Sequence, residues 1–280
     1  MTMPELAGLG RTGAGPVLQR DDRGGAARFR LNRPLRNNCL NSDLCDALLA
    51  GLLEASADPA VRVIVITGAG DAFCSGEELD TGYSAVPQAA VPRAAAGQVC
   101  RQMPDLPYLR ICEAILHAPK PVIAGINGVS AGAGTEIACA ADYRLAADTA
   151  RIGSFLTTMG QLGNAVMLPR VVGWARATEI YLTGRLVPAA EAAEIGLVNR
   201  TVVAEDLDAE LDVLAARLAS GPTKAIGMYK ELRDRAWGQP VEYGLHLQGI
   251  YHRRADRELS DGAEGVSAFL EDRLPRFSGE

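Results

Sequence analysis

The sequence has few aromatic residues and no long run of apolar residues. Phenylalanine, tryptophan and tyrosine together make up 5% of the 280 residues. Alanine, valine, leucine and glycine must therefore fill the core, which favours closely packed backbone layers. The apolar stretch at 61–67 is far shorter than the ~20 residues that a membrane-spanning helix needs. We expect a soluble globular protein that does not contact a membrane.

Positive charge is also scarce. The chain has 28 Lys and Arg against 34 Asp and Glu, a formal net charge of −6. Nucleic-acid binding rests on clustered cations, so we expect no nucleic-acid partner, although a few local arginines can still hold one phosphate group. The six cysteines are scattered with no C-x-x-C pair, and the first residues lack the apolar region of a secretion signal. We therefore expect reduced thiols and a cytoplasmic location.

Length and pattern predict one α/β core with a helical appendage. We predict a flexible tail over 1–15, an α/β core over 16–204 and a helical subdomain over 205–280. A segment rich in Ala, Pro, Gly and Gln at 82–107 is typical of a mobile segment that covers a pocket. Ser42 is the expected cap of the first helix. The expected elements are a hairpin over 16–31, helices over 42–56 and 108–117, and strands over 61–68, 119–126 and 143–147.

Two glycine-rich turns carry the strongest chemical signal. Residues 68–79 (GAGDAFCSGEEL) and 127–136 (NGVSAGAGTE) each follow a buried strand and place small residues where a helix is expected to begin. Unpaired N–H groups at such helix starts point outward, and two turns side by side can aim two donors at one oxygen. Glu136 follows close by in the second turn. Taken alone, either turn is more often a packing device, and a lone helix glutamate is usually solvated.

Five segments in order resemble motifs of the enoyl-CoA hydratase/isomerase (crotonase) superfamily. LNRPLRNNCL resembles the LNRP-x-x-x-NAL segment of that family, and ITGAGDAFCSGEEL resembles TG-x-G-x-FCAGADL. The stretch KPVIAGINGVSAGAGTEIACAADYRLAADTARI resembles its central motif. LPRVVGWARATEIYLTGRLVPAAEAAEIGLVNRTV and DGAEGVSAFLEDRLPRF resemble the late motifs, so the likeness covers roughly residues 16–280.

The resemblance implies an α/β fold with a crotonase-like ββα superhelix core and a C-terminal helical subdomain. It also implies homotrimers, often paired into hexamers, and acyl-CoA thioester substrates. The thioester oxygen would lie between the backbone N–H groups of Glu77 and Ala133, where they can stabilise an enolate.

The resemblance also assigns the acid and base of the reaction. Glu136 matches the first of the two glutamates of a hydratase, but the second position falls at Leu156. Glu77 stands where the family usually has Ala or Gly. We hypothesise that Glu77 and Glu136 form a relocated carboxylate pair, with one pKa raised by mutual repulsion and burial. The alternative is that Glu77 points to solvent. Secondary polar candidates are Ser130, Thr157, Thr158, Gln161 and Asn164.

Coenzyme A is expected as part of the substrate, without any further cofactor or metal. By resemblance, Arg36, Asn38 and Cys39 would lie near its adenine and phosphates. Phe269 and Arg273 match positions that often reach the coenzyme A of a neighbouring subunit.

Three functions are compatible with these residues. The leading one is enoyl-CoA hydration or double-bond isomerisation through a thioester enolate. The first alternative is another crotonase-type reaction: C–C bond hydrolysis or lysis, decarboxylation or thioester hydrolysis. The second is a non-catalytic binding or scaffold protein on the same fold, which the loss of one glutamate favours and the intact turns oppose.

Overall fold

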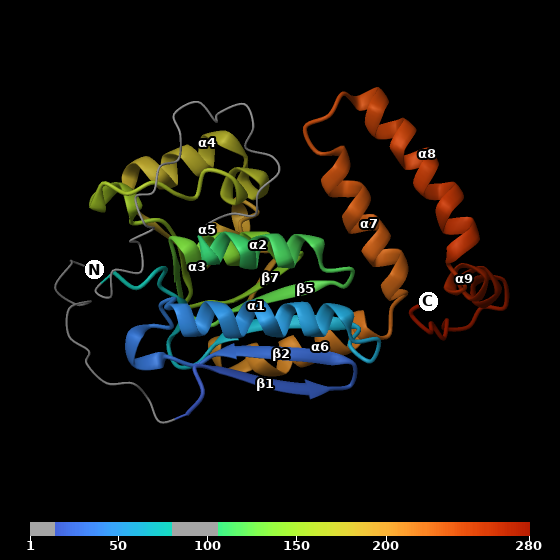
Figure 1. The fold of residues 1–280 in the computed structure, drawn as a ribbon, viewed down its shortest axis with the longest axis horizontal. Coiled ribbons are helices and arrows are strands. Elements are labelled where there is room, and N and C mark those ends of the chain that lie inside the picture. Colours follow the sequence, from blue (N-terminus) through green and yellow to red (C-terminus); the bar gives the residue numbers. More distant parts are fainter. Residues whose placement is uncertain (1–14, 80–105) are drawn as a thin grey trace.

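The computed structural model describes residues 15–79 and 106–280, and its centre is a six-stranded sheet in the order β1-β2-β3-β5-β7-β10 (Figure 1). β1 and β2 form an antiparallel hairpin, and every other neighbouring pair in this sheet is parallel. The strands are β1 (Leu18–Arg23), β2 (Ala26–Leu31), β3 (Val63–Gly68), β5 (Val122–Ile126), β7 (Tyr143–Ala147) and β10 (Arg200–Val202).

A second, smaller sheet has the order β4-β6-β8-β9. Its strands are β4 (Ala72–Cys74), β6 (Val129–Ala131), β8 (Arg151–Gly153) and β9 (Leu186–Pro188). Strands β3, β5 and β7 of the first sheet are each followed within a few residues by a strand of the second, namely β4, β6 and β8. The chain therefore winds through both sheets in successive turns, which confirms the predicted superhelical α/β core.

Helices cover both faces of the large sheet. α1 (Ser42–Ala57), α2 (Pro107–His117) and α3 (Ala133–Ala140) lie side by side over one face, and α6 (Leu207–Ala219) packs on the sheet as well (Figure 1). Strand residues alternate between faces, so Phe29 of β2 is buried while its neighbours Arg28 and Arg30 point to the other side. These two arginines pair with Asp212 and Asp208 of α6. α6 therefore covers the face opposite to α1.

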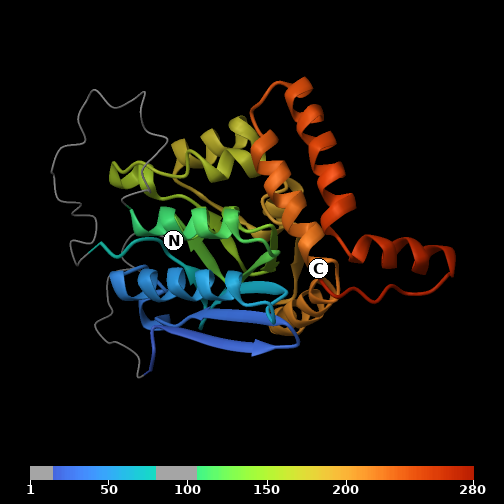
Figure 2. The ribbon, with the colours of Figure 1, turned by 45° about the vertical axis from the view of Figure 1, so that its right-hand side comes forward.

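The last helices form an appendage that is tied to the core by buried charges. α7 (Thr223–Ala236) and α8 (Val241–Glu258) form a hairpin beside the core, and α9 (Asp261–Leu270) projects beyond it (Figures 1 and 2). Asp142, at the start of β7, lies 2.6 Å from Lys230 and 3.1 Å from Arg233 of α7. α4 (Met167–Thr183) and α5 (Ala189–Glu194) complete the described helices.

Most of the expected elements are confirmed, and the differences have local causes. The Asn41 side chain, not Ser42, caps α1 by accepting from the Leu44 N–H. β9 was not expected, because its three residues offer no alternation to detect. The domain boundary at 204–205 stays a prediction, although α6 beyond it packs on the core sheet. The tail and the segment at 82–107 lie largely outside the described residues. Within the described ranges, the helices are too short or too polar to cross a membrane.

Candidate active site

The two glycine-rich turns lie against each other in the structure. β4 and β6 are parallel neighbours, with Cys74 paired to Ser130, so the turns that follow them meet at one edge. A Cβ atom at Gly134 would lie 2.2 Å from the Cys74 carbonyl oxygen, and one at Gly76 would lie 3.1 Å from that of Ala131. Gly76 also has a φ of +106°, which other residues rarely adopt. Glycine at both positions therefore allows the close approach of the turns.

The N–H groups predicted to bind the substrate oxygen are both free. Leu40 accepts from the Glu78 N–H at 2.9 Å and donates to the Gly76 carbonyl at 2.8 Å, so the Glu77 N–H between them points away from Leu40. Ala133 begins α3, and its N–H has no acceptor within the helix. Neither group donates a hydrogen bond to any of the described residues, and both residues line one cavity of about 80 Å³. This arrangement fits a pair of main-chain donors for one oxygen.

Glu136 follows Ala133 by about one turn of α3 and lines the same cavity. Its side chain is 4% exposed and accepts a hydrogen bond of 3.2 Å from the Met167 N–H. Burial raises the pKa of Glu136 to about 7, although hydrogen bonds from the main chain of Met167 and Asn164 oppose the shift. A carboxyl group with this pKa can both accept and return a proton near neutral pH.

Glu77 lines the cavity too, so its carboxylate does not simply point to solvent. Its Oε1 atom is buried and has no hydrogen-bond partner among the described residues. Burial raises the pKa of Glu77 as well. The repulsion that the hypothesis assumes between the two glutamates is not needed to account for these shifts and stays a prediction. Burial alone accounts for the raised pKa values, and the pairing itself stays a prediction.

Leu156 places an apolar group where the resemblance implies a second glutamate. It begins a short 3₁₀ helix (Leu156–Met159) and lines the cavity. Its Cδ2 atom lies 3.7 Å from the position of a Cβ on Gly132, and its Cδ1 atom is closer still to that of Gly163. Leu156 therefore packs between two backbone segments beside Glu136 and offers no proton.

Asn164 and Tyr108 are further polar residues of the cavity. Asn164 is 2% exposed, has a φ of +55° and donates from Nδ2 to the Gly132 carbonyl at 2.9 Å. Its Oδ1 atom is buried without a partner in the part of the chain that the structure describes. The sequence marked Asn164 only as a secondary candidate. Sequence reasoning did not identify Tyr108, because α2 and the glycine-rich turns are far apart along the chain. Ser130 is fully buried in β6.

The first group of predicted coenzyme A residues surrounds Glu78. The Glu78 carboxylate lies 2.7 Å from Arg33, 3.5 Å from Arg36 and 3.7 Å from the Cys39 sulfur. Asn38 is fully buried, and its amide bonds the main chain at three places. Asn38 therefore holds the loop in shape, whereas Arg36 and Cys39 are partly exposed.

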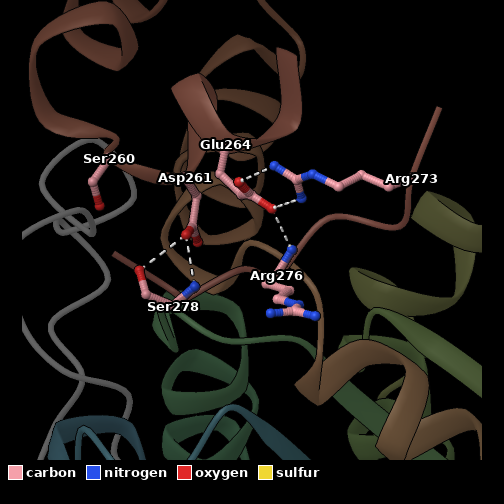
Figure 3. A pocket seen from close by; sticks show the side chains of 6 residues that line it. All are labelled: Ser260, Asp261, Glu264, Arg273, Arg276 and Ser278. Carbon is pink, nitrogen blue, oxygen red and sulfur yellow. Dashed lines mark hydrogen bonds and ion pairs between the residues drawn. The ribbon is translucent and has the colours of Figure 1, made fainter. Parts of the chain in front are cut away.

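The second group, Phe269 and Arg273, lies far from the first. β2 ends at one side of the molecule, and α9 projects from the other (Figures 1 and 2). Figure 3 shows Arg273 reaching Glu264, and the distances are 2.6 and 3.0 Å. Phe269 is 83% exposed. The structure therefore does not bring the two groups together within one chain.

The hollow beside α9 is larger than the cavity at Glu136, at about 490 Å³, but most of its charged side chains already have hydrogen-bond partners. Asp261 accepts from the Ser278 hydroxyl and from the main chain of Ser278 and Gly279.

Groups of three or more His, Cys, Asp or Glu side chains arranged to hold a metal do not occur among the described residues. The unpaired groups around Glu136 therefore make its cavity the better candidate site.

Comparison with known proteins places the chain in a family. Residues 21–280 match the family model for enoyl-CoA hydratase/isomerase. The chain is 33% identical to the 1,2-epoxyphenylacetyl-CoA isomerase of Escherichia coli over 91% of its length and 96% of that protein. It is 36% identical to a probable enoyl-CoA hydratase of Rhodobacter capsulatus over 91% and 95% of the two chains.

Solved structures give the same result. A putative enoyl-CoA hydratase from Streptomyces coelicolor has a TM-score of 0.82 at 32% identity, covering 99% of this chain and 100% of that one. An enoyl-CoA hydratase from Bacillus anthracis has a TM-score of 0.80 at 31% identity, covering 94% and 100%. The chain belongs to the enoyl-CoA hydratase/isomerase family and has the crotonase fold.

Proposed function

We propose that the protein moves a double bond within an acyl-CoA thioester by way of an enolate. The N–H groups of Glu77 and Ala133 would donate to the thioester oxygen, and negative charge would develop there as Glu136 removes a proton from the α-carbon. The protonated Glu136 would then return that proton to the γ-carbon. The same proton leaves one carbon and joins another, so the step needs no other acid.

The apolar Leu156 is the observation that carries isomerisation over hydration. Hydration needs one group to activate water and another to deliver a proton. Leu156, which lines the cavity with Glu136, offers no proton at the position where the resemblance implies a second glutamate. The pKa of Glu136, raised by burial to about 7, suits a single residue that both accepts and donates.

One observation favours hydration as a second candidate. Glu77 lines the same cavity, its pKa is raised by burial, and one oxygen of its carboxylate is buried without a partner within the described ranges. A water molecule held by Glu77 would be activated on one side of the substrate while Glu136 supplies the proton. The other crotonase-type reactions and the non-catalytic alternative have no such specific support.

Paired assays on the purified protein separate these functions. A 3-enoyl-CoA tests isomerisation through the ultraviolet absorption of the conjugated product, and crotonyl-CoA tests hydration through the loss of that absorption. We expect isomerisation to be the faster reaction and Glu77→Gln to keep most of it, because Glu77 would contribute only its main-chain N–H.

Other results would overturn the proposal. Faster hydration, abolished by Glu77→Gln, would establish the carboxylate pair instead. Failure to bind any acyl-CoA would remove both candidates and leave the non-catalytic alternative.

Assembly remains to be tested along with activity. We infer a homotrimer or a pair of trimers, supported by large apolar side chains that α8 and α9 expose. These are Val241, Leu245, Val266, Phe269 and Leu270, which are 62–83% exposed. Sedimentation measurements test this, and a monomer at micromolar concentration would contradict it.

We also propose that the reaction needs no metal ion. Turnover should then be unchanged after metals are removed with a chelator. The cytoplasmic location stays a prediction.

A further inference from the structure

Asn164 hydrogen-bonds two separate parts of the candidate active site. Its side-chain amide donates to the Gly132 carbonyl at 2.9 Å, and its main-chain N–H bonds the Glu136 carboxylate. The residue is 2% exposed and lines the cavity together with Ala133 and Glu136. Asn164 therefore holds both the turn that would supply a main-chain donor and the carboxylate that would carry the proton.

The Gly132 carbonyl belongs to the same peptide group as the Ala133 N–H. This peptide group is trans and planar, so its C=O and its N–H point in opposite directions. A donor that fixes the direction of the Gly132 carbonyl therefore fixes the direction of the Ala133 N–H. The carbonyl has two such donors, the Glu136 N–H at 3.1 Å from within α3 and the Asn164 amide from outside it.

Steric contact does little to hold this peptide group in place. Gly132 has a φ of +53°, and glycine has the widest range of backbone angles of any residue. A Cβ atom at this position would lie 3.7 Å from its nearest neighbour, which is an ordinary contact distance. Hydrogen bonds to the carbonyl must therefore maintain the orientation of the group.

The conformation of Asn164 is unfavourable for the fold itself. Its φ of +55° lies in the left-handed region that residues other than glycine rarely adopt. Its Oδ1 atom is buried and has no partner within the described ranges, although buried polar atoms nearly always have one. Strained residues of this kind cluster at functional sites. A glycine would relieve both features, so stability does not account for an asparagine here.

We propose that Asn164 is a positioning residue that directs the Ala133 N–H at the thioester oxygen by holding the Gly132 carbonyl. This inference rests on the proposed function, because it assumes that this N–H binds the thioester oxygen of an acyl-CoA. The amide acts through the peptide group and needs no contact with the substrate. Its loss should impair enolate formation more than binding, since the bond to the oxygen strengthens as negative charge develops there.

The vibrational spectrum of a bound thioester tests the orientation of the donor. The probe is crotonyl-CoA labelled with ¹³C at the thioester carbonyl, and the Glu136→Gln variant serves as the host so that turnover does not consume the ligand. Hydrogen bonding lowers the stretching frequency of a carbonyl group. Adding Asn164→Gly to the host should therefore shift the band of the bound ligand to higher frequency.

The kinetics of the single variant Asn164→Gly give a second measurement. Losing one main-chain donor of this kind costs roughly 10²- to 10³-fold in kcat, so a misdirected donor should cost about 10- to 100-fold, with a smaller change in KM. The acidic limb of the kcat/KM profile should stay in place, because glycine keeps the main-chain N–H that bonds Glu136. The midpoint of thermal unfolding should equal or exceed that of the wild type, because glycine relieves the backbone strain.

Asn199 offers a matched control. Its side chain also bonds the main chain, accepting from the Arg144 N–H at 2.8 Å, but it lies directly before β10 and away from the cavity. Asn199→Gly should leave both the carbonyl band and kcat unchanged. If Asn164→Gly does not fold, Asn164→Ala is the substitute, since alanine also lacks the amide and keeps the main-chain N–H.

The possible failures are distinguishable. An unchanged carbonyl band after Asn164→Gly, in a host that binds crotonyl-CoA, would overturn the proposal and leave the proposed function intact. A lower unfolding midpoint together with a shifted acidic limb would mean that Asn164 only supports the fold. Failure of the host to bind crotonyl-CoA would count against the proposed function itself.

Discussion

Glu136 and Glu264 occupy the same place in two helices, yet their surroundings differ. Each is the fourth residue of its helix, Glu136 in α3 and Glu264 in α9. Burial raises the pKa of Glu136 to about 7. Hydrogen bonds from the Arg273 side chain and the Arg276 main chain lower the pKa of Glu264 to about 2. Position in a helix therefore decides little about a carboxyl group; its desolvation and its partners decide whether it can carry protons.

Replacing Glu136 and Glu264 in separate variants should give the largest difference in kcat. Glu136→Gln should lower kcat roughly 10²- to 10⁴-fold, because the variant has no group to move the proton. Glu264→Gln should leave kcat within about twofold, since Glu264 only bonds residues of its own hollow. Initial rates with a 3-enoyl-CoA measure both. Equal losses would mean that α9 takes part in catalysis.

The stability of the fold should respond to pH with opposite sign at the two sites. The folded-state pKa of Glu136 lies above its usual 4.5, so the folded protein binds the extra proton and loses stability as pH rises from about 4.5 to about 7. The shift corresponds to about 3 kcal/mol. Glu136→Gln should therefore be more stable than the wild type at pH 8 and equal to it near pH 4.5, as measured by urea unfolding.

Glu264 provides the converse test. Its lowered pKa stabilises the fold above pH 4.5, and this contribution is lost as pH falls towards about 2. Glu264→Gln should thus be less stable than the wild type at pH 7, with a smaller difference at pH 4. If Glu264→Gln were instead more stable than the wild type at pH 7, the hydrogen bonds from the arginine partners of Glu264 would not stabilise the fold.

The smallest effect is expected from adding a carboxylate beside Glu136. Leu156→Glu would place a second negative charge in the cavity, which should raise the pKa of Glu136 and shift the acidic limb of the kcat/KM profile upward by roughly one unit. Leu156→Gln is the uncharged control and should leave the limb in place. If the acidic limb of the kcat/KM profile were the same in Leu156→Glu as in the wild type, the new glutamate side chain would point out of the cavity.

What the sequence could predict depended on whether the signal was local. The glycine turns and Glu136 could be predicted because each lies in a short continuous segment that follows a strand, and the loss of the acid at Leu156 followed from the family resemblance over an ungapped stretch. Tyr108 could not, because only the packing of α2 beside α3 brings this residue to the cavity. Whether Glu77 and Glu136 repel each other stays a prediction, because a shared cavity does not fix the separation of two carboxylates.

The hydrogen bonds to Glu136 link its acidity to the chain that precedes α4. The main-chain N–H groups of Asn164 and Met167 hold the pKa of Glu136 below the value that burial alone would give. A change that removed these donors while the carboxyl group stayed buried would raise the pKa of Glu136, so the proton affinity of the site is linked to the backbone of residues 164–167.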